Sequence, residues 1–351
     1  MLPSNIGGIT NSSILPVEAG VRIRLREVFA TVLVGAAGAG SLRAQAPDSA
    51  AVTVIASACT DLVGSQMAVC QAAHDAVFAA LPAVSILIGG GNPKLGTAAA
   101  NGKFGSITLT LRATHTLVVL PSTEYDGSTD TVKLVRRHHT TLPSVDVGFG
   151  LFKKDMPTGT VGVEFLGSVF LMDPDGTPYL TYPEDTRKVG GYVIGFGWGM
   201  RFGLTPKGSL PFASLSVTKR DLPHYTYGDL AAGSTYSYTL GISAINIRLL
   251  AGRQFGKFEF TMGAGADMLK GTYSVLYTDP ETEALQPQVD STRSAMRIIT
   301  TANAALDLKP MRLTFEAGYQ VGKDEKLPTI VRTVDPRSGR FFAGAGLAVR
   351  F

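Results

Sequence analysis

A period of two in side-chain character runs through most of this chain and limits the folds open to it. From about residue 103 to the C-terminus, apolar residues alternate with small, polar or charged ones. The pattern is clearest between Lys188 and Phe202, where large apolar side chains take every second position and glycine or arginine the positions between. This period places one face of a β-strand in an apolar environment and the other in a polar one. The sequence therefore predicts a protein built mainly of strands.

Ten segments carry the alternation, and their connections differ in a regular way. The predicted strands are 104–120, 144–153, 159–171, 188–202, 209–219, 235–250, 257–274, 292–308, 311–321 and 341–351. Short turns alternate strictly with long polar connections, which are 121–142, 173–187, 221–234, 278–291 and 322–340. Near Ala244–Ile245 the alternation slips by one residue, which predicts a β-bulge. An even number of strands with such connections predicts an antiparallel sheet whose two ends differ.

Composition narrows the class of protein. Charged residues make up 17% of the chain and hydrophobic residues 45%, whereas about 25% charged residues is usual in soluble proteins. After residue 50 there is no purely apolar run of about 18 residues, so helical membrane spans are not expected. The net charge of +4 includes arginines at 22, 24 and 26. The charge pattern therefore gives no sign of a nucleic-acid partner.

The first 46 residues have the features of an export signal. Arginines at 22, 24 and 26 precede a short apolar run at 28–40, and Ala44-Gln45-Ala46 offers small residues for cleavage. We expect a signal peptide over 1–46 and a mature chain from about Pro47. The alternative is an amphipathic first helix. Residues 1–20 have no role in either interpretation and are typical of an over-extended start.

The C-terminal strand adds a resemblance to a known class. Its alternate residues from Phe341 to Phe351 are apolar, the others are small or basic, and the chain stops on an aromatic. With the signal peptide and the alternating connections, residues 103–351 resemble bacterial outer-membrane β-barrel proteins. The resemblance implies an up-and-down antiparallel transmembrane barrel of about ten strands, with eight or twelve as alternatives. It also implies contact with outer-membrane lipid, recognition of the C-terminal strand by the barrel-assembly machinery, short turns at the periplasmic end and long loops outside.

The segment 47–102 is predicted to hold one short helix. Apolar residues spaced by threes and fours between Ala58 and Ala80 indicate the helix, and Pro82 is expected to end or kink it. The helix would lie against the periplasmic end of the barrel, which we slightly prefer, or inside the lumen as a plug. The exported chain has only Cys59 and Cys70, which are candidates for a disulfide. On one continuous helix they would lie about 16 Å apart, so a bridge requires a break near Gly64.

The predicted inward faces of the strands carry charges of both signs. They are Arg112, Asp146, Glu164, Arg201, Arg248, Glu259, Asp267, Arg297, Asp307, Arg312, Glu316 and Arg350. Ionisable side chains inside a membrane are normally paired, so the favoured interpretation is a self-satisfied polar interior. The alternative is a charged constriction that selects small solutes. Tyrosines near the long connections predict an interfacial aromatic girdle and are Tyr179, Tyr182, Tyr225, Tyr227, Tyr236, Tyr238, Tyr273 and Tyr277.

These features favour a passive function. We expect a structural or loop-displaying barrel, or a narrow pore for small solutes. The alternatives are a hydrophobic-solute transporter resembling the FadL family with an N-terminal plug, an adhesin, or an omptin-like hydrolase that would use Asp221, His224, His138 and His139 at the rim. No enzyme, metal or cofactor motif is present, so we expect neither an enzyme nor a cofactor. The oligomeric state is left open by the sequence.

Overall fold

The computed structural model describes residues 59–351, apart from 101, 127–130, 174–179, 185 and 323–338. The chain separates into two compact units, Met1–Ala51 and Val52–Phe351. All described residues belong to the second unit. The predicted signal peptide, 1–46, lies outside the described residues.

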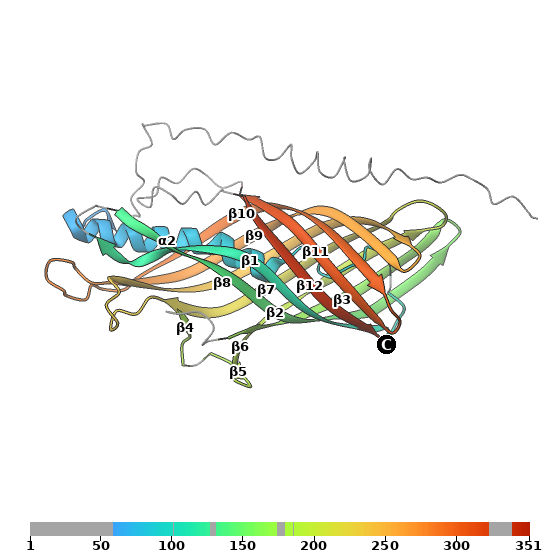
Figure 1. The fold of residues 1–351 in the computed structure, drawn as a ribbon, viewed down its shortest axis with the longest axis horizontal. Coiled ribbons are helices and arrows are strands. Elements are labelled where there is room, and N and C mark those ends of the chain that lie inside the picture. Colours follow the sequence, from blue (N-terminus) through green and yellow to red (C-terminus); the bar gives the residue numbers. More distant parts are fainter. Residues whose placement is uncertain (1–58, 101, 127–130, 174–179, 185, 323–338) are drawn as a thin grey trace, which may run out of the picture. The chain divides into compact units, whose positions relative to one another are not determined.

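The described part of the chain forms a closed antiparallel barrel of ten long strands (Figure 1). In chain order they are β1 (Ile107–Asp126), β2 (Thr131–Met156), β3 (Gly159–Met172), β6 (Tyr192–Pro206), β7 (Phe212–Tyr227), β8 (Tyr236–Phe255), β9 (Phe258–Tyr277), β10 (Val289–Asp307), β11 (Met311–Gly322) and β12 (Arg340–Arg350). Each pairs with the next, and β12 pairs with β1. The two-residue strands β4 (Leu180–Thr181) and β5 (Lys188–Val189) add to β7 and β6. The predicted ten-stranded barrel is confirmed.

The two ends of the barrel differ as the connections predict. One end, here the turn end, holds the short connections β2–β3, β6–β7, β8–β9 and β10–β11 together with the C-terminus (Figure 1). The other, the loop end, holds the β7–β8 and β9–β10 connections, which lie within the described residues. The predicted long connection 121–142 is wrong, because β1 continues to Asp126 and β2 begins at Thr131. This part of β1 and β2 was missed because it is polar and lacks a clean alternation.

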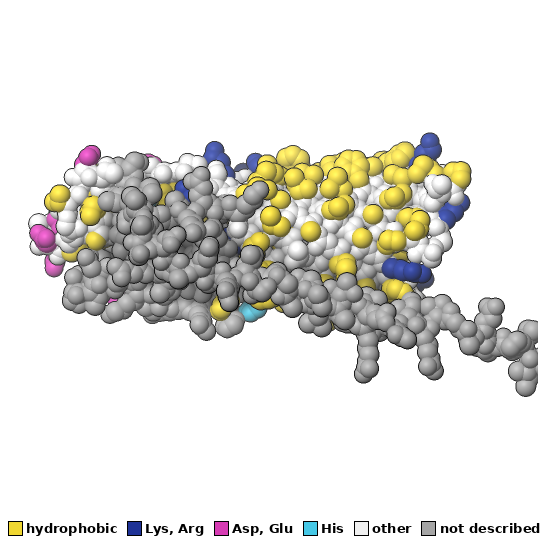
Figure 2. Space-filling view, turned by 90° about the horizontal axis from the view of Figure 1, so that it is seen from above, with side chains coloured by type: hydrophobic (Ala, Val, Ile, Leu, Met, Phe, Trp, Pro, Cys, Tyr) yellow, Lys and Arg dark blue, Asp and Glu magenta, His cyan; other side chains and the backbone are white. Residues whose placement is uncertain are grey.

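The outer surface divides the barrel into two halves. On β9, the outward side chains from Phe258 to Met268 are apolar, and the next outward ones are Lys270 and Thr272. The apolar part spans about 34 Å along the strand, or about 24 Å along the axis at a tilt of about 45°. That height matches the apolar band of an outer-membrane barrel, about 25 Å. Figure 2 shows hydrophobic side chains gathered over the half toward the turn end.

The inner surface has the reverse arrangement. In β8, the inward side chains from Tyr236 to Ala244 are aromatic or aliphatic. The outward side chains become apolar only from Ile245 onward. Ala244 pairs with Leu269 and Ile245 with Met268, so both strands change at one level. The predicted bulge at Ala244–Ile245 is therefore wrong, since the pairing of β8 with β9 is continuous there. The change of phase in the alternation marks the level of the barrel at which the apolar side chains change from the outer to the inner face.

The apolar interior of the loop half surrounds helix α2 (Gly64–Gly89), which is buried over most of its length. It contacts β1, β2, β7, β8 and β9. By length and composition it could cross a membrane, but it lies inside the barrel. Pro82 stands within the helix and does not end it, because the enclosing wall keeps the following apolar turns helical. Of the two expected placements, these contacts support the luminal one.

The predicted tyrosine girdle is wrong for the tyrosines of β7, β8 and β9. These side chains point inward and form the core around the helix: Tyr225, Tyr227, Tyr236, Tyr238, Tyr273 and Tyr277. Tyr182 packs against the same core, and Tyr179 lies outside the described residues. Large aromatic rings with one polar atom suit this position, since they bury much area and still reach polar partners.

The chain runs through the lumen from the loop end to the turn end. At the start of α2, Ser65 Oγ donates to Glu281 and Gln66 Nε2 to Asp279, both in the β9–β10 loop. A disulfide joins Cys59 to Cys70, and Gly64, with φ of 57°, makes the break between them. After Gly89 the chain continues without helix to β1 at the turn end. We call residues 88–100 the luminal segment.

Candidate functional site

Five arginines on the barrel wall bind backbone carbonyls of the luminal segment. Arg220 donates to the carbonyls of Ile88 and Gly89, and Arg248 to those of Gly91 (2.8 Å) and Gly90 (3.0 Å). Arg112 donates to the carbonyl of Asn92 (3.0 Å). Arg312 donates to that of Gly96 (3.2 Å), and Arg201 to those of Thr97 (3.0 Å) and Ala99 (3.1 Å). We call this set, Arg112, Arg201, Arg220, Arg248 and Arg312, the arginine clamp. From Gly90 onward the segment forms bends and turns without helix or strand, and its carbonyls have wall donors in place of helical ones.

Wall carboxylates complete the attachment by accepting from the same segment. Glu316 Oε2 accepts from the Asn92 amide at 3.1 Å. Glu259 Oε1 accepts from the Thr97 hydroxyl at 2.7 Å and from the Ala98 amide at 3.1 Å. Glycine permits the close fit, because a Cβ at Gly91 would lie 2.4 Å from Thr301 Oγ1. The segment is thus bonded to several strands of the wall rather than resting loosely in a pore.

The predicted lumen-facing charges are brought together in buried ion pairs. The pairs are Arg112 with Asp146 (3.7 Å) and Glu316, Arg201 with Glu164 (2.5 Å), Arg248 with Asp267 (2.7 Å), and Arg312 with Glu259 (2.9 Å) and Asp307 (3.1 Å). Arg297 donates to Gln320 at 2.7 Å, and Gln320 donates to Asp267 at 2.6 Å. Arg350 alone of the predicted set is exposed, at the turn end. Pairing of this kind offsets the cost of burying charge.

Sequence reasoning missed Lys94, Asn92 and Arg220. Lys94, in the luminal segment, forms a buried ion pair with Glu164 on β3. Arg220 lies where the inner surface of β7 changes from polar to apolar. The alternation in the sequence therefore did not indicate whether its side chain points inward or outward. The run of three glycines at 89–91 was a usable signal, because consecutive glycines allow backbone to approach a wall closely.

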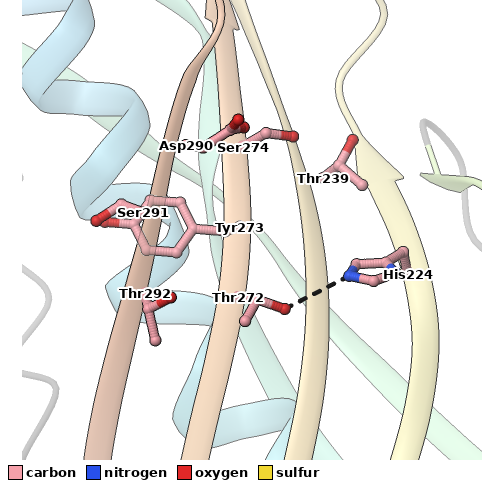
Figure 3. Close-up of a pocket in the computed structure, with 8 residues that line it drawn as sticks. All are labelled: His224, Thr239, Thr272, Tyr273, Ser274, Asp290, Ser291 and Thr292. Carbon is pink, nitrogen blue, oxygen red and sulfur yellow. Dashed lines mark hydrogen bonds between the residues drawn. The ribbon is translucent and has the colours of Figure 1, made fainter.

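A polar groove lies on the outer wall of the loop half, outside the apolar band (Figure 3). Its cavity is about 380 Å³ and is lined by His224, Thr239, Thr272, Tyr273, Ser274, Asp290, Ser291 and Thr292. A register shift in β7 between Leu222 and Tyr225 accompanies the outward placement of His224. The ring lies over Gly241, where a Cβ would come within 2.5 Å of it, and Thr272 Oγ1 is 3.4 Å from His224 Nε2.

The residues of the omptin-like alternative are not brought together among the described side chains. Asp221 pairs with Lys219 at 3.3 Å on the exposed outer wall. The contact of His224 is with Thr272. His138 and His139 belong to β2, but their side chains lie outside the described part of the structure.

The barrel's own surfaces define its class. Its strands close without a free edge, its outward side chains form an apolar band of bilayer height, and its interior at that level is polar and paired. The protein is therefore a transmembrane β-barrel of the bacterial outer membrane.

No family model and no curated protein matches the sequence. Solved structures of similar architecture include the outer-membrane protease OmpT from Escherichia coli, at 10% identity and a TM-score of 0.36, covering 74% of this chain and 100% of that one. The β domain of the Bordetella autotransporter BrkA matches at 14% identity and a TM-score of 0.33, over 71% and 100% of the two chains. The CymD monoaromatic hydrocarbon channel matches at 11% identity and a TM-score of 0.29, over 76% of this chain and 97% of that one. These proteins differ in function and share only the barrel with this chain.

Proposed function

We propose that this protein is a closed, loop-displaying barrel whose lumen is filled by its own chain. The observation that supports this is the arginine clamp, in which wall arginines donate to the backbone of residues 88–99. A small-solute pore would need those donors free to face water or solute. The loop half, with its own apolar core, stands beyond the apolar band as a rigid platform for the loops.

Conductance in planar bilayers tests the closed state. We expect the refolded wild-type protein to insert without a steady conductance. The double variant Arg112→Gln/Arg248→Gln removes two clamp arginines and should show brief openings, because the segment loses donors at Gly90, Gly91 and Asn92. Lys219→Gln, on the outer wall, is the matched control and should stay silent. A steady wild-type conductance would contradict the proposal.

A hydrophobic-solute transporter is the second candidate, and the tyrosine-lined apolar interior of the loop half favours it. In that case α2 would have to move to admit a solute. Liposomes loaded with a solvatochromic dye report entry of an aromatic hydrocarbon. Faster entry than in protein-free liposomes, abolished by a cross-link between α2 and β9, would support transport. Equal rates with and without protein would exclude it.

We infer a non-enzymatic role, supported by the separate partners of Asp221 and His224. Incubation with denatured and basic peptide substrates, followed by mass spectrometry, tests this. Cleavage by the wild type that is lost in His224→Ala would overturn the inference.

We further propose that the C-terminal strand is the part recognised by the barrel-assembly machinery. Phe351 is 76% exposed, and its amide donates to the carbonyl of Ile107 at 2.9 Å, next to the closing seam. Deleting Phe351 should reduce assembled, heat-modifiable protein in cells without preventing refolding in detergent. Equal assembly of both proteins in cells would contradict it.

A further inference from the structure

Three cationic residues line one cavity at the mouth of the lumen at the turn end. Lys103, Lys153 and Arg350 line a cavity of about 230 Å³ together with Ser106, Ile107, Thr108 and Phe351. Lys153 pairs in register with Gly162, and Arg350 with Thr108, both of which face the lumen. In contrast, Lys154 is in register with the outward Val161. The three cations therefore share the mouth, whereas their neighbour Lys154 faces away from it.

The backbone that carries Lys103 is held firmly in place. The amide of Gly105 donates to the carbonyl of Gly150 at 3.1 Å, and the amide of Gly150 donates to that of Ser106 at 2.8 Å. Ser106 Oγ donates to the carbonyl of Lys103 at 2.6 Å. A Cβ at Gly150 would lie 2.1 Å from the Lys103 carbonyl oxygen, so only glycine allows this contact. The position of Lys103 at the mouth is thus set by the fold.

The charge at this mouth is not balanced by the protein. Within the described part of the chain, neither Lys103, Lys153 nor Arg350 forms a salt bridge, whereas the carboxylates deeper in the lumen are already paired. Glu164 pairs with Arg201, and Glu259 and Asp307 both pair with Arg312. No Asp or Glu side chain is among the residues that line the cavity. Two lysines and one arginine without an acidic side chain in the lining leave an excess of positive charge at this mouth.

We propose that this mouth binds a phosphate group. A phosphate carries about two negative charges at neutral pH and three acceptor oxygens. Arginine matches such oxygens with a planar fork and lysine provides point charges, and Thr108 adds a hydroxyl in the same cavity. The site faces the side expected to be periplasmic, where a phosphate can belong to a soluble molecule or to the headgroup of an anionic phospholipid at the membrane boundary.

Isothermal titration of the detergent-refolded protein with inorganic phosphate and with pyrophosphate tests the site. We expect saturable binding that weakens with added salt. Lys153→Gln and Arg350→Gln should each weaken it about tenfold, because each removes a charged contact. Lys154→Gln is the matched control, with the same charge change on the adjacent outward residue, and should bind as the wild type does. Circular dichroism and heat-modifiable migration identify any variant that has not folded.

Nanodiscs separate the two sources of the phosphate. Thermal stabilisation by phosphatidylglycerol over phosphatidylcholine, reversed by Lys153→Gln and not by Lys154→Gln, identifies a lipid headgroup. Stabilisation by free pyrophosphate in both lipids identifies a soluble ligand. The proposal is overturned if neither probe binds the folded protein, or if Lys153→Gln and Lys154→Gln change binding equally.

Discussion

At the scale of single residues, the interior of this barrel contains ionisable groups whose state depends on burial and partners. His74, on α2, is 1% exposed, and its Nδ1 lies 3.0 Å from Tyr273 Oη. This position lies in the loop half, beyond the apolar band. Burial lowers the pKa of His74 from 6.5 to about 4. The pKa falls because the charged imidazolium would lose its hydration in the apolar core, so the neutral form is favoured there.

His74 predicts a loss of stability in mild acid. Between pH 6.5 and about 4 the unfolded chain binds a proton at this residue that the folded chain does not. Stability from this group is therefore complete above pH 6.5 and declines as the pH falls toward 4. Urea unfolding at pH 7.5 and 4.5 should show a smaller difference for His74→Gln than for the wild type. The exposed His224→Gln serves as control, and an unchanged difference in His74→Gln would contradict the assignment.

Glu316 predicts the cost of removing one partner from the luminal network. It accepts from Arg112 and from the Asn92 amide. Glu316→Ala should destabilise the folded barrel by about 3 kcal/mol, since it leaves a buried guanidinium short of its carboxylate. Urea midpoints measure this, and Arg112→Met/Glu316→Leu should recover part of the loss. A loss in the double variant equal to the sum of the losses in Arg112→Met alone and Glu316→Leu alone would show that the residues are not coupled.

At the scale of elements, the same strand pattern has two meanings at two levels of the barrel. In the band, outward residues are apolar because they face lipid. In the loop half, inward residues such as Tyr238 and Leu240 are apolar because they face α2. This explains why the slip at Ala244–Ile245 looked like a bulge. It also explains the misassigned tyrosines, because a position near a strand end does not tell inside from outside.

The start of α2 depends on its attachment at the loop end. The disulfide closes a loop of separation 11, and in the chain-entropy account such a cross-link contributes about 3 kcal/mol. Cys59→Ser/Cys70→Ser should raise amide exchange over residues 60–70. Residues 80–89 should keep their protection, because Arg220 holds the carbonyls of Ile88 and Gly89. Mass spectrometry of peptic fragments measures both, and uniform exchange along α2 would contradict separate anchoring.

At the scale of the whole molecule, the apolar band fixes which part of the barrel meets lipid. Trp198, the single tryptophan of the chain, points outward from β6 within the band and is 57% exposed. Thr272 lies outward in the polar loop half. We therefore expect only the half of the barrel nearer the turn end to span the membrane.

Brominated lipids test this placement directly. Fluorescence of Trp198 should be quenched strongly by lipids brominated in the acyl chain. In Trp198→Phe/Thr272→Trp, the tryptophan should be quenched little, because residue 272 lies beyond the band. Equal quenching at both positions would mean that lipid covers the loop half too.

The direction of the luminal chain predicts where residues before Cys59 emerge. Ser65 and Gln66 bind the β9–β10 loop, so α2 begins at the loop end. An epitope tag inserted between Pro47 and Cys59 should be labelled by antibody on intact cells. A tag in the β8–β9 turn, at Gly256, is the control and should be labelled only after the outer membrane is opened. Labelling of the first tag only after opening would reverse the topology.

Much of this protein was determined locally by its sequence. The alternation, the even strand count and the alternating connections specify a closed barrel. Each strand must present an apolar face to lipid and must form backbone hydrogen bonds with a neighbouring strand at both edges. Which inward charges pair, and that wall arginines bind the chain's own carbonyls, was decided only by the tertiary structure. Arg112 and Glu316 are 204 residues apart in the chain, and a period of two gives each residue a face but no partner. The helix likewise obtained its place from the enclosing wall, since an apolar helix can be buried by lipid or by protein, and only closure of the barrel around it selects the second.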